Sequence, residues 1–320
     1  MNIEMIKAAA TRLAPVVRRT PMLSSPFLDE MAGRRVLVKA ENLQHTGSFK
    51  FRGGWSALSG MTEAQRAKGV IAYSSGNHAQ GVAMAAAKFG VPAVILMPAD
   101  SPILKIANTK ALGAEVVTYD RLRDSREDIG ARLAGARGLT FVKPFDEPLV
   151  IAGQGTVGLE IVEQAMAEGV EQADVLIPCG GGGLTSGISI TLEGTNLRAR
   201  TCEPEEFDDA ARSLASGKHE VNATQGGSIC DAIVTNSPGE ITLPIMMKNC
   251  GSGLVVSDAE AMQAVALAYQ RLKIVLEPGG AVALAAALFH TDEIESDAVI
   301  VVATGGNVDT DVFVRCLETL

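Results

Sequence analysis

The sequence lacks the features that mark an extracellular, membrane-spanning or nucleic-acid-binding protein. Its five cysteines are scattered and odd in number, and they show no Cys-x-x-Cys or Cys/His spacing typical of a zinc site. No apolar run is long enough to span a bilayer, and the N-terminus carries charges where a signal peptide has an apolar block. The net charge of -9 disfavours nucleic acid and anionic membranes as partners. We therefore expect a soluble, cytoplasmic protein with reduced thiols.

The chain of 320 residues exceeds the usual size of one hydrophobic core, which predicts two lobes of an α/β protein. Short β-branched runs alternate with helical patterns, and this alternation is typical of βαβ units and of parallel sheets flanked by helices. Strands are predicted at residues 36–40, 70–73, 93–97, 116–119, 141–143, 175–177, 199–202 and 298–302. Helices are predicted at 5–16, 157–166 and 258–274, and residues 144–148 are expected to cross between the lobes.

Lys50 is the first candidate for chemistry, because it lies between two phenylalanines shortly after a predicted strand. Burial in apolar surroundings would lower the pKa of its amine. A neutral amine forms an imine with an aldehyde such as pyridoxal phosphate. The alternative is an ordinary lysine whose stem extends from a helix N-terminus to solvent.

The loop Ser74-Ser75-Gly76-Asn77-His78 follows the strand at 70–73 and leads into an Ala-rich helix. Small residues at a helix start expose backbone N–H groups, which suit a carboxylate ligand. Two structural interpretations remain open: the serine or asparagine could serve only as an N-cap, and His78 could serve only in packing.

Four consecutive glycines, Gly180–Gly183, lie between the strand at 175–177 and a helix. Such a run is costly for folding unless the backbone must approach something closely, and a phosphate at a helix N-terminus is the usual ligand. No Gly-Lys-Ser/Thr follows, so this is not a nucleoside triphosphate P-loop. A dinucleotide loop of a dehydrogenase, with Glu203 on the ribose, remains a rival interpretation.

The segment from Glu203 to Asp209 is the densest acidic cluster of the chain. It could be a solvated turn in which Asp208 and Asp209 favour the start of a helix. It could also hold a divalent cation through oxygen ligands. Beyond the last strand, Thr304 places a lone hydroxyl at a strand's carboxyl end, where ligands of parallel sheets bind.

Six motifs in this order resemble one family, the fold-type II pyridoxal phosphate enzymes, in the branch of threonine/serine dehydratases and serine racemase. They are Ser48-Phe49-Lys50-Phe51-Arg52-Gly53, residues 74–80, Ile151-Ala152-Gly153-Gln154-Gly155-Thr156, residues 180–183, Leu276-Glu277-Pro278 and Thr304-Gly305-Gly306-Asn307. The resemblance covers about residues 19–309. It implies a two-lobed fold like that of the tryptophan synthase β subunit, with a large cofactor-binding domain at 1–58 and 147–320 and a small domain at 59–146. A homodimer is also expected.

The resemblance also implies a role for each matching residue. Lys50 would hold the cofactor as an imine, Phe49 would pack on its ring, Asn77 would bond the ring hydroxyl, Thr304 would face the pyridine nitrogen, and Gly180, Gly181, Gly182 and Gly183 would hold the phosphate. Around the substrate carboxylate would lie Ser74, Ser75 and His78. The divalent-cation site of some members (Mg, Mn or Ca) matches Glu203, Asp209 and the carbonyl of Phe207.

The neutral hydroxyl of Thr304 cannot keep the ring nitrogen protonated, so the ring would be a weak electron sink that suits loss of a β-hydroxyl. We therefore expect a lyase that converts L-serine or L-threonine, with 3-hydroxyaspartate as a contender, to a 2-oxo acid and ammonia, with the Lys50 amine taking the α-proton. Serine racemase is the alternative, because Ser75 resembles the racemase serine that exchanges a proton opposite the lysine. An amino-acid sensor is the non-enzyme rival. Three departures from the family pattern, Lys143, Gly54 and Ala232, together with Cys230, leave the substrate preference open.

Overall fold

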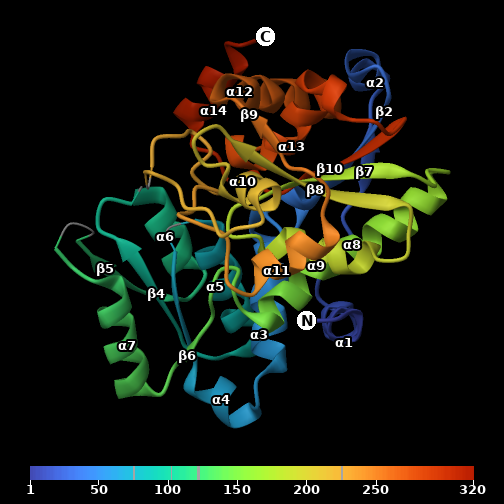
Figure 1. Ribbon diagram of the computed structural model, residues 1–320. Helices are drawn as coiled ribbons and strands as arrows, with labels where there is room; N and C mark the ends of the chain where they lie inside the picture. Colours follow the sequence, from blue (N-terminus) through green and yellow to red (C-terminus); the bar gives the residue numbers. More distant parts are fainter. Residues whose placement is uncertain (75, 102, 121–122, 225) are drawn as a thin grey trace.

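The computed structural model describes residues 1–74, 76–101, 103–120, 123–224 and 226–320, and its strands form two sheets in separate parts of the molecule (Figure 1). The larger sheet has the strand order β1-β2-β10-β7-β8-β9, and the smaller has the order β5-β4-β3-β6. The strands are β1 (Met22–Ser24), β2 (Arg35–Ala40), β3 (Val70–Tyr73), β4 (Ala93–Pro98), β5 (Glu115–Tyr119), β6 (Thr140–Phe141), β7 (Ala173–Pro178), β8 (Leu197–Pro204), β9 (Leu254–Val256) and β10 (Ala298–Ala303).

The sheets are parallel apart from one edge, where β1 pairs antiparallel with β2. Every residue of the central strands β7 and β10 is buried, as expected of parallel strands covered on both faces. The predicted fold class, parallel sheets flanked by helices, is thereby confirmed. The strands of the smaller sheet all lie within residues 59–146, although the domain boundaries themselves stay a prediction.

Helices cover both faces of the larger sheet. On one face, α12 (Asp258–Leu267) and α13 (Pro278–Phe289) pack in the same apolar cluster as Val299 and Val301 of β10. On the other face, α8 (Pro148–Ala167) and α9 (Gly183–Leu192) pack with Ile300 and Val302. The alternation along β10 follows the two-residue period of a strand. The N-terminal α1 (Ile3–Leu13) lies against α8.

The smaller sheet is surrounded by α4 (Glu63–Lys68), α5 (Asn77–Phe89), α6 (Ile103–Ala111) and α7 (Arg126–Arg137) (Figure 1). Between the two sheets, α3 (Lys50–Gly60) packs against both α5 and α8. The α3–α5 crossing is close, since a Cβ on Gly54 would lie 2.9 Å from the carbonyl oxygen of Gly81. Gly54 therefore permits the close approach of the two helices. The remaining α-helices are α2 (Pro26–Ala32), α10 (Asp209–Ser216), α11 (Thr242–Asn249) and α14 (Thr310–Leu317).

Some predicted elements were displaced or missed. The strand predicted at 141–143 is β6, which ends at Phe141, and the three-residue strands β1 and β9 were not predicted because three residues carry no readable period. The helix predicted at 258–274 ends as α12 at Leu267 and continues as a π-helical turn, Ala268–Leu272. None of the helices in the described ranges is both long and apolar enough to cross a membrane.

Candidate active site

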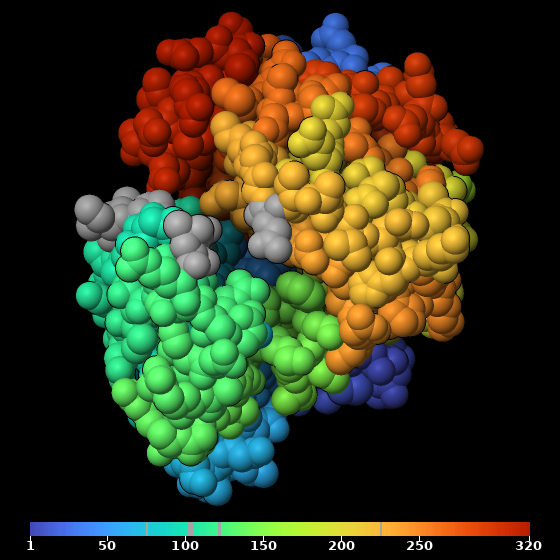
Figure 2. Space-filling view, turned by 60° about the vertical axis from the view of Figure 1, so that its left-hand side comes forward, coloured from blue at the N-terminus to red at the C-terminus, as the bar shows by residue number. Residues whose placement is uncertain are grey.

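A cavity of about 530 Å³ opens between the two sheets and is lined by residues from both of them. Figure 2 shows the surface hollowed between the green residues of the small sheet's helices and the yellow-to-orange residues of the large lobe. The chain after β3, β7 and β10 reaches this cavity, so the loops at the carboxyl ends of parallel strands meet there. Lys50, Ser74, Asn77, His78, Gly180–Gly183 and Thr304 all line it, as do Phe49 and Glu277.

Lys50 begins α3, and its ammonium donates a hydrogen bond to the carbonyl oxygen of Pro144 at 3.0 Å. The Phe49 ring centroid lies 5.1 Å from the same nitrogen. The residue is partly exposed to the open cavity, but protein atoms crowd its amine. Burial lowers the pKa of Lys50 to about 8, and the carboxyl group of Glu277 only partly opposes this shift. The amine is therefore closer to neutrality than that of an ordinary lysine, as the sequence predicted.

Backbone contacts tie the Lys50 segment to the end of β10. Ser48 forms an isolated β-bridge with Gly305, and the Phe49 N–H donates to the Thr304 carbonyl oxygen at 3.2 Å. Two segments about 250 residues apart in sequence are thereby joined at the cavity. Thr304 itself is almost fully buried and lines the cavity, so a neutral hydroxyl is placed in the same site as the amine.

The glycine loop packs so tightly that side chains would not fit in it. A Cβ on Gly181 would collide with the ring of Phe145, and Gly182 has a φ of 85°, which disfavours other residues. The loop leads into α9, whose first N–H groups have no partner within the helix. A narrow, uncharged cradle at a helix N-terminus fits a phosphate group.

Two of the predicted substrate-binding residues, Ser74 before α5 and His78 in its first turn, lie within the described residues. The Ser74 hydroxyl accepts a hydrogen bond from the N–H of Gly76 at 3.2 Å, while Ser75 lies outside the described residues. His78 is buried, and its Nε2 lies 2.9 Å from the carbonyl oxygen of Val142. Because a carbonyl only accepts, Nε2 carries the proton and Nδ1 is a bare acceptor.

Burial lowers the pKa of His78 to about 3, so the ring is neutral. Nδ1 of this ring has no partner among the described residues. A neutral ring whose only proton is already donated cannot donate to a carboxylate. His78 can therefore bind a carboxylate only through its backbone N–H, which narrows the role that we predicted for it.

Glu277 and Asn307 join the site, although the sequence assigned no role to either. Glu277 is almost fully buried and accepts a hydrogen bond from Nδ2 of Asn77 at 2.5 Å. Burial raises the pKa of Glu277 to about 7. Asn307 donates to Oδ1 of Asn77 at 2.7 Å. The Asn307 motif follows β10 and the Glu277 motif directly precedes α13, but neither motif indicates which side chain it will meet.

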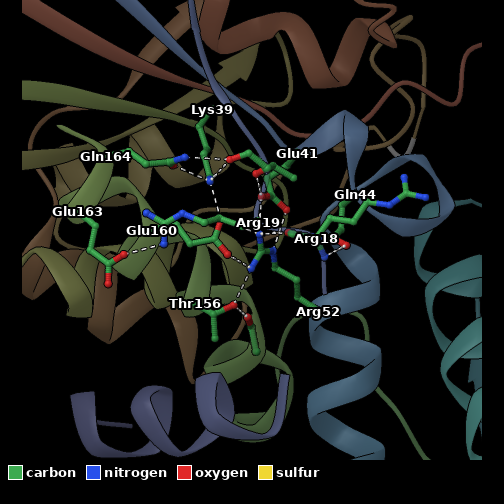
Figure 3. A network of polar contacts seen from close by, with 12 residues as sticks. Arg18, Arg19, Lys39, Glu41, Gln44, Arg52, Thr156, Glu160, Glu163 and Gln164 are labelled. Carbon is green, nitrogen blue, oxygen red and sulfur yellow. Dashed lines mark hydrogen bonds and ion pairs between the residues drawn. The ribbon is translucent and has the colours of Figure 1, made fainter. Parts of the chain in front are cut away.

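A buried ionic network lies behind the site and holds the first turn of α3 (Figure 3). Arg52, two residues after Lys50, is fully buried and pairs with Glu41 at 2.8 Å and with Glu160 at 2.7 Å. Lys39 pairs with the same Glu160 at 2.5 Å. The network joins α3 to β2 and α8, so the segment that carries Lys50 is anchored to the larger sheet.

The acidic cluster after β8 is only partly solvated. Glu203 is fully buried, and its carboxylate accepts hydrogen bonds from the N–H groups of Ala210 at 3.0 Å and Ala211 at 2.7 Å. Burial raises the pKa of Glu203 well above its usual value and that of Asp209 to about 6. Asp209 Oδ2 is buried and has no hydrogen-bond partner in the part of the chain that the structure describes, and Phe207 is also buried.

Two adjacent buried carboxyl groups with one unpaired oxygen fit an oxygen-ligand cation site. The fit is partial, because both oxygens of Glu203 already accept bonds from α10. Within the described residues, no group of three or more His, Cys, Asp or Glu side chains is arranged to hold a metal ion.

Comparison with known proteins agrees with this site. The family model described as pyridoxal-phosphate dependent enzyme matches residues 13–305. The chain is 42% identical to an L-threo-3-hydroxyaspartate ammonia-lyase of Pseudomonas sp, over 97% of this chain and 96% of that protein. It is 37% identical to an L-threonine ammonia-lyase of Thermotoga maritima, over 99% of this chain and 78% of that protein. The structure of maize serine racemase superimposes with a TM-score of 0.90 at 33% identity, covering 99% of this chain and 97% of that one.

These similarities confirm the predicted fold-type II architecture and exclude the dehydrogenase interpretation of the glycine loop. The cavity, the Lys50 amine and the glycine loop are consistent with the cofactor that the family model names. The chain belongs to the family of pyridoxal-phosphate dependent enzymes.

Proposed function

We propose that the protein is an ammonia-lyase that converts L-threo-3-hydroxyaspartate to oxaloacetate and ammonia. The predicted class, a pyridoxal phosphate-dependent lyase of hydroxy amino acids, agrees with the named activities of the two relatives above. The choice of substrate rests on one observation in this chain. Two cationic side chains, Lys105 and Arg126, line the same cavity as Lys50.

The candidate substrates differ at the β-carbon. Serine bears hydrogen there, threonine a methyl group and 3-hydroxyaspartate a second carboxylate. A carboxylate needs a cationic or N–H-rich partner when it leaves water, whereas a methyl group beside a cation removes water from it and offers no hydrogen bond in return. The cations on the wall formed by α6 and α7 therefore favour the dicarboxylic substrate.

Both cations are placed so that a substrate can recruit them. The Lys105 ammonium lies 3.3 Å from a carboxylate oxygen of Asp231, whose side chain is mostly exposed. Arg126 lies over the Tyr73 ring, with its guanidinium carbon 5.0 Å from the centroid, and bonds the exposed Glu127 at 2.7 Å. The exposed pair of Arg126 with Glu127 contributes little free energy, so exchanging it for a substrate carboxylate costs little. Asp231 is exposed enough to stay hydrated without Lys105.

Pyridoxal phosphate, bound through Lys50, would supply the electron sink that lets the α-proton leave. The glycine cradle and the start of α9 would bind its phosphate, and Thr304 would meet its ring nitrogen without protonating it. The N-terminus of α5 would hold the α-carboxylate through backbone N–H groups. The lowered pKa of Lys50 leaves its amine able to accept the α-proton at neutral pH. The substrate's β-hydroxyl would then leave as water, which together with the α-proton accounts for the atoms lost, and hydrolysis would give ammonia and the 2-oxo acid.

A divalent cation (Mg, Mn or Ca) at Glu203, Asp209 and the carbonyl of Phe207 belongs to this proposal. A bound cation would neutralise the two carboxyl groups that burial leaves with raised pKa values. The site lies at the start of α10, close to the glycine loop's neighbour Cys179, so its effect would be on the stability of the cofactor-binding lobe. A homodimer and a cytoplasmic location stay predictions from the sequence.

Serine racemase remains the alternative, because Ser75, which lies outside the described residues, resembles in sequence the serine of the racemases. Racemisation needs a proton donor on the face of the substrate opposite Lys50. Accumulation of D-serine from L-serine without release of ammonia is the outcome that favours this alternative over the lyase.

The decisive experiment measures release of ammonia and 2-oxo acid from L-serine, L-threonine and L-threo-3-hydroxyaspartate, each with and without magnesium. We expect the highest kcat/KM with 3-hydroxyaspartate. In Arg126→Met, its KM should rise about tenfold or more while that for serine changes little, because a charged hydrogen bond is lost only with the dicarboxylate.

Arg132→Met removes an exposed arginine from the same helix, α7, and is the matched control. Faster turnover of serine or threonine, together with an unchanged preference in Arg126→Met, contradicts the proposed substrate.

A further inference from the structure

A chain of hydrogen bonds runs along one wall of the cavity, from the backbone before Lys50 to the carboxyl group of Glu277. The Thr46 carbonyl oxygen accepts from Nδ2 of Asn307 at 2.7 Å. The same Nδ2 donates to Oδ1 of Asn77 at 2.7 Å, and Nδ2 of Asn77 donates to Oε1 of Glu277 at 2.5 Å. The four residues come from four separate segments of the chain.

The direction of every bond in this chain follows from its first member. A backbone carbonyl can only accept, so the amide nitrogen of Asn307 must face Thr46. Its second hydrogen then goes to Asn77, whose oxygen is the acceptor. The amide of Asn77 cannot flip, because its oxygen would then face the carboxylate oxygen of Glu277. One backbone carbonyl thus decides the orientation of a side chain in the cavity.

One N–H of the Asn77 side-chain amide is available to donate a hydrogen bond to a ligand. Its amide nitrogen has two hydrogens, and among the described residues only one of them is used, toward Glu277. Asn77 lines the cavity and begins α5. An amide held in this way offers an N–H, and not a carbonyl oxygen, to whatever group lies beside it.

We propose that Asn307 and Glu277 are positioning residues that hold Asn77 as a hydrogen-bond donor to the ring oxygen of pyridoxal phosphate. The donor favours the cofactor with its ring hydroxyl ionised, because an N–H stabilises an oxyanion and an amide oxygen would repel it. The inference rests on the family assignment and does not depend on which amino acid is the substrate.

Backbone features around the chain support a specific arrangement. Thr46 has a φ of 61°, which is unusual for a residue with a branched side chain. Such a backbone conformation persists only where the surrounding structure imposes it. A Cβ on Gly47 would lie 2.6 Å from Oδ1 of Asn307. A Cβ on Gly305 would collide with Oε1 of Glu277. The two glycines therefore leave room for the two side chains that hold Asn77.

Glu277 supplies the acceptor oxygen that holds the Asn77 amide, and its charge strengthens this bond without being required for it. The titratable groups around it are Asp231, which raises its pKa, and Lys105 and Lys50, which lower it. An ionised Glu277 accepts more strongly from Asn77 than a neutral group does, and the amide of a glutamine accepts in the same geometry. The bond needs an acceptor oxygen at this position, so glutamine should conserve the orientation of Asn77 and leucine should not.

The test compares the affinity of the enzyme for pyridoxal 5'-phosphate and for 3-deoxypyridoxal 5'-phosphate, which lacks the ring oxygen. The preference is the ratio of the two dissociation constants. Asn307→Asp puts an oxygen where the donor was, so Asn77 loses its fixed orientation. We expect the preference of the unmodified enzyme to fall about tenfold in Asn307→Asp and in Glu277→Leu, and to be largely kept in Glu277→Gln.

Asn196→Asp makes the same substitution at an exposed site away from the cavity and is the control. A general loss of folding weakens the binding of both cofactors equally and leaves the ratio of their dissociation constants unchanged. An unchanged ratio in the test variants therefore counts against the inference. A shift in the visible absorption of the bound cofactor, and in the pH at which it changes, should accompany the loss of preference. Equal behaviour of Glu277→Gln and Glu277→Leu, or an unchanged preference in Asn307→Asp, overturns the proposal.

Discussion

Replacement of Arg52 by methionine should cost the protein about 3–5 kcal/mol of unfolding free energy. The buried network behind the site holds two cations, Arg52 and Lys39, and two carboxylates, Glu41 and Glu160, so its charges balance. Methionine conserves most of the volume but leaves two carboxylates facing one cation. Removing one partner of a buried ion pair is costly because an uncompensated charge stays in the interior.

The pH dependence of this cost follows from the pKa values. Burial alone would raise the pKa of Glu160, but Arg52 and Lys39 together outweigh it, with Arg52 the larger contributor, and the pKa lies below the usual 4.5. A depressed pKa contributes stability above pH 4.5 that is lost as the pH falls through the folded-state value. The difference in stability between the unmodified protein and Arg52→Met should therefore be largest at neutral pH and shrink below about pH 4.5.

Urea unfolding at saturating pyridoxal phosphate, followed by fluorescence, measures the effect. Trp55 is the single tryptophan and lies in α3, the helix that carries Arg52. Arg19→Met breaks the exposed pair with Glu163 and should cost less than about 1 kcal/mol. Adding Glu160→Gln to Arg52→Met restores neutrality and should recover part of the loss. If Arg52→Met is as mild as Arg19→Met, or equally costly at all pH values, the charge argument is refuted.

Three further predictions concern the cavity. Lys50→Ala should abolish turnover and the borohydride-reducible link to the cofactor. In the cofactor-free protein, the rate at which the Lys50 amine reacts with aldehydes should have its pH midpoint near 8 instead of 10.5. Gly182→Ala should weaken cofactor binding, measured by dialysis, more than the control Gly194→Ala does. Both glycines have a positive φ, but only a Cβ at Gly182 would crowd Met246. Glu277→Gln should become more stable relative to the unmodified cofactor-free protein as the pH rises from about 4.5 to above 7, by roughly 3 kcal/mol in urea unfolding, because the raised folded-state pKa makes ionisation costly. A flat difference across that range contradicts the last of these.

The sequence predicted the strands that carry the site and the loops beyond them, because parallel strands buried on both faces read as short apolar runs between helical patterns. Lys50, the glycine loop and Thr304, which the structure brings to one cavity, were chosen as candidates for the same reason, since each stands directly after or near such a strand. The short edge strands β1 and β9 escaped because their pairing is decided by neighbours in space.

Local sequence patterns also could not predict hydrogen-bond and ion-pair partners that are distant in the sequence. Arg52 stands in the quoted lysine motif, but nothing in that motif indicates Glu41 or Glu160, which lie 11 and 108 residues away. The link from Asn77 to Glu277 spans 200 residues. Local patterns report which residues face a core or begin a helix, and they carry no information on which buried polar groups will satisfy one another.

The first turn of α3 both presents Lys50 to the cavity and anchors the helix to the larger sheet. Successive helical residues are rotated by about 100°, so Lys50 and Arg52 lie on nearly opposite sides of the helix. Lys50 thereby faces the cavity, while Arg52 faces the ionic network between β2 and α8. Gly54 lets the same turn approach α5, and a Cβ on Gly53 would crowd Gln154 of α8. Held on three sides, the turn has little freedom to rotate, and the position of the Lys50 amine at the cavity is set by contacts on the far sides of the helix.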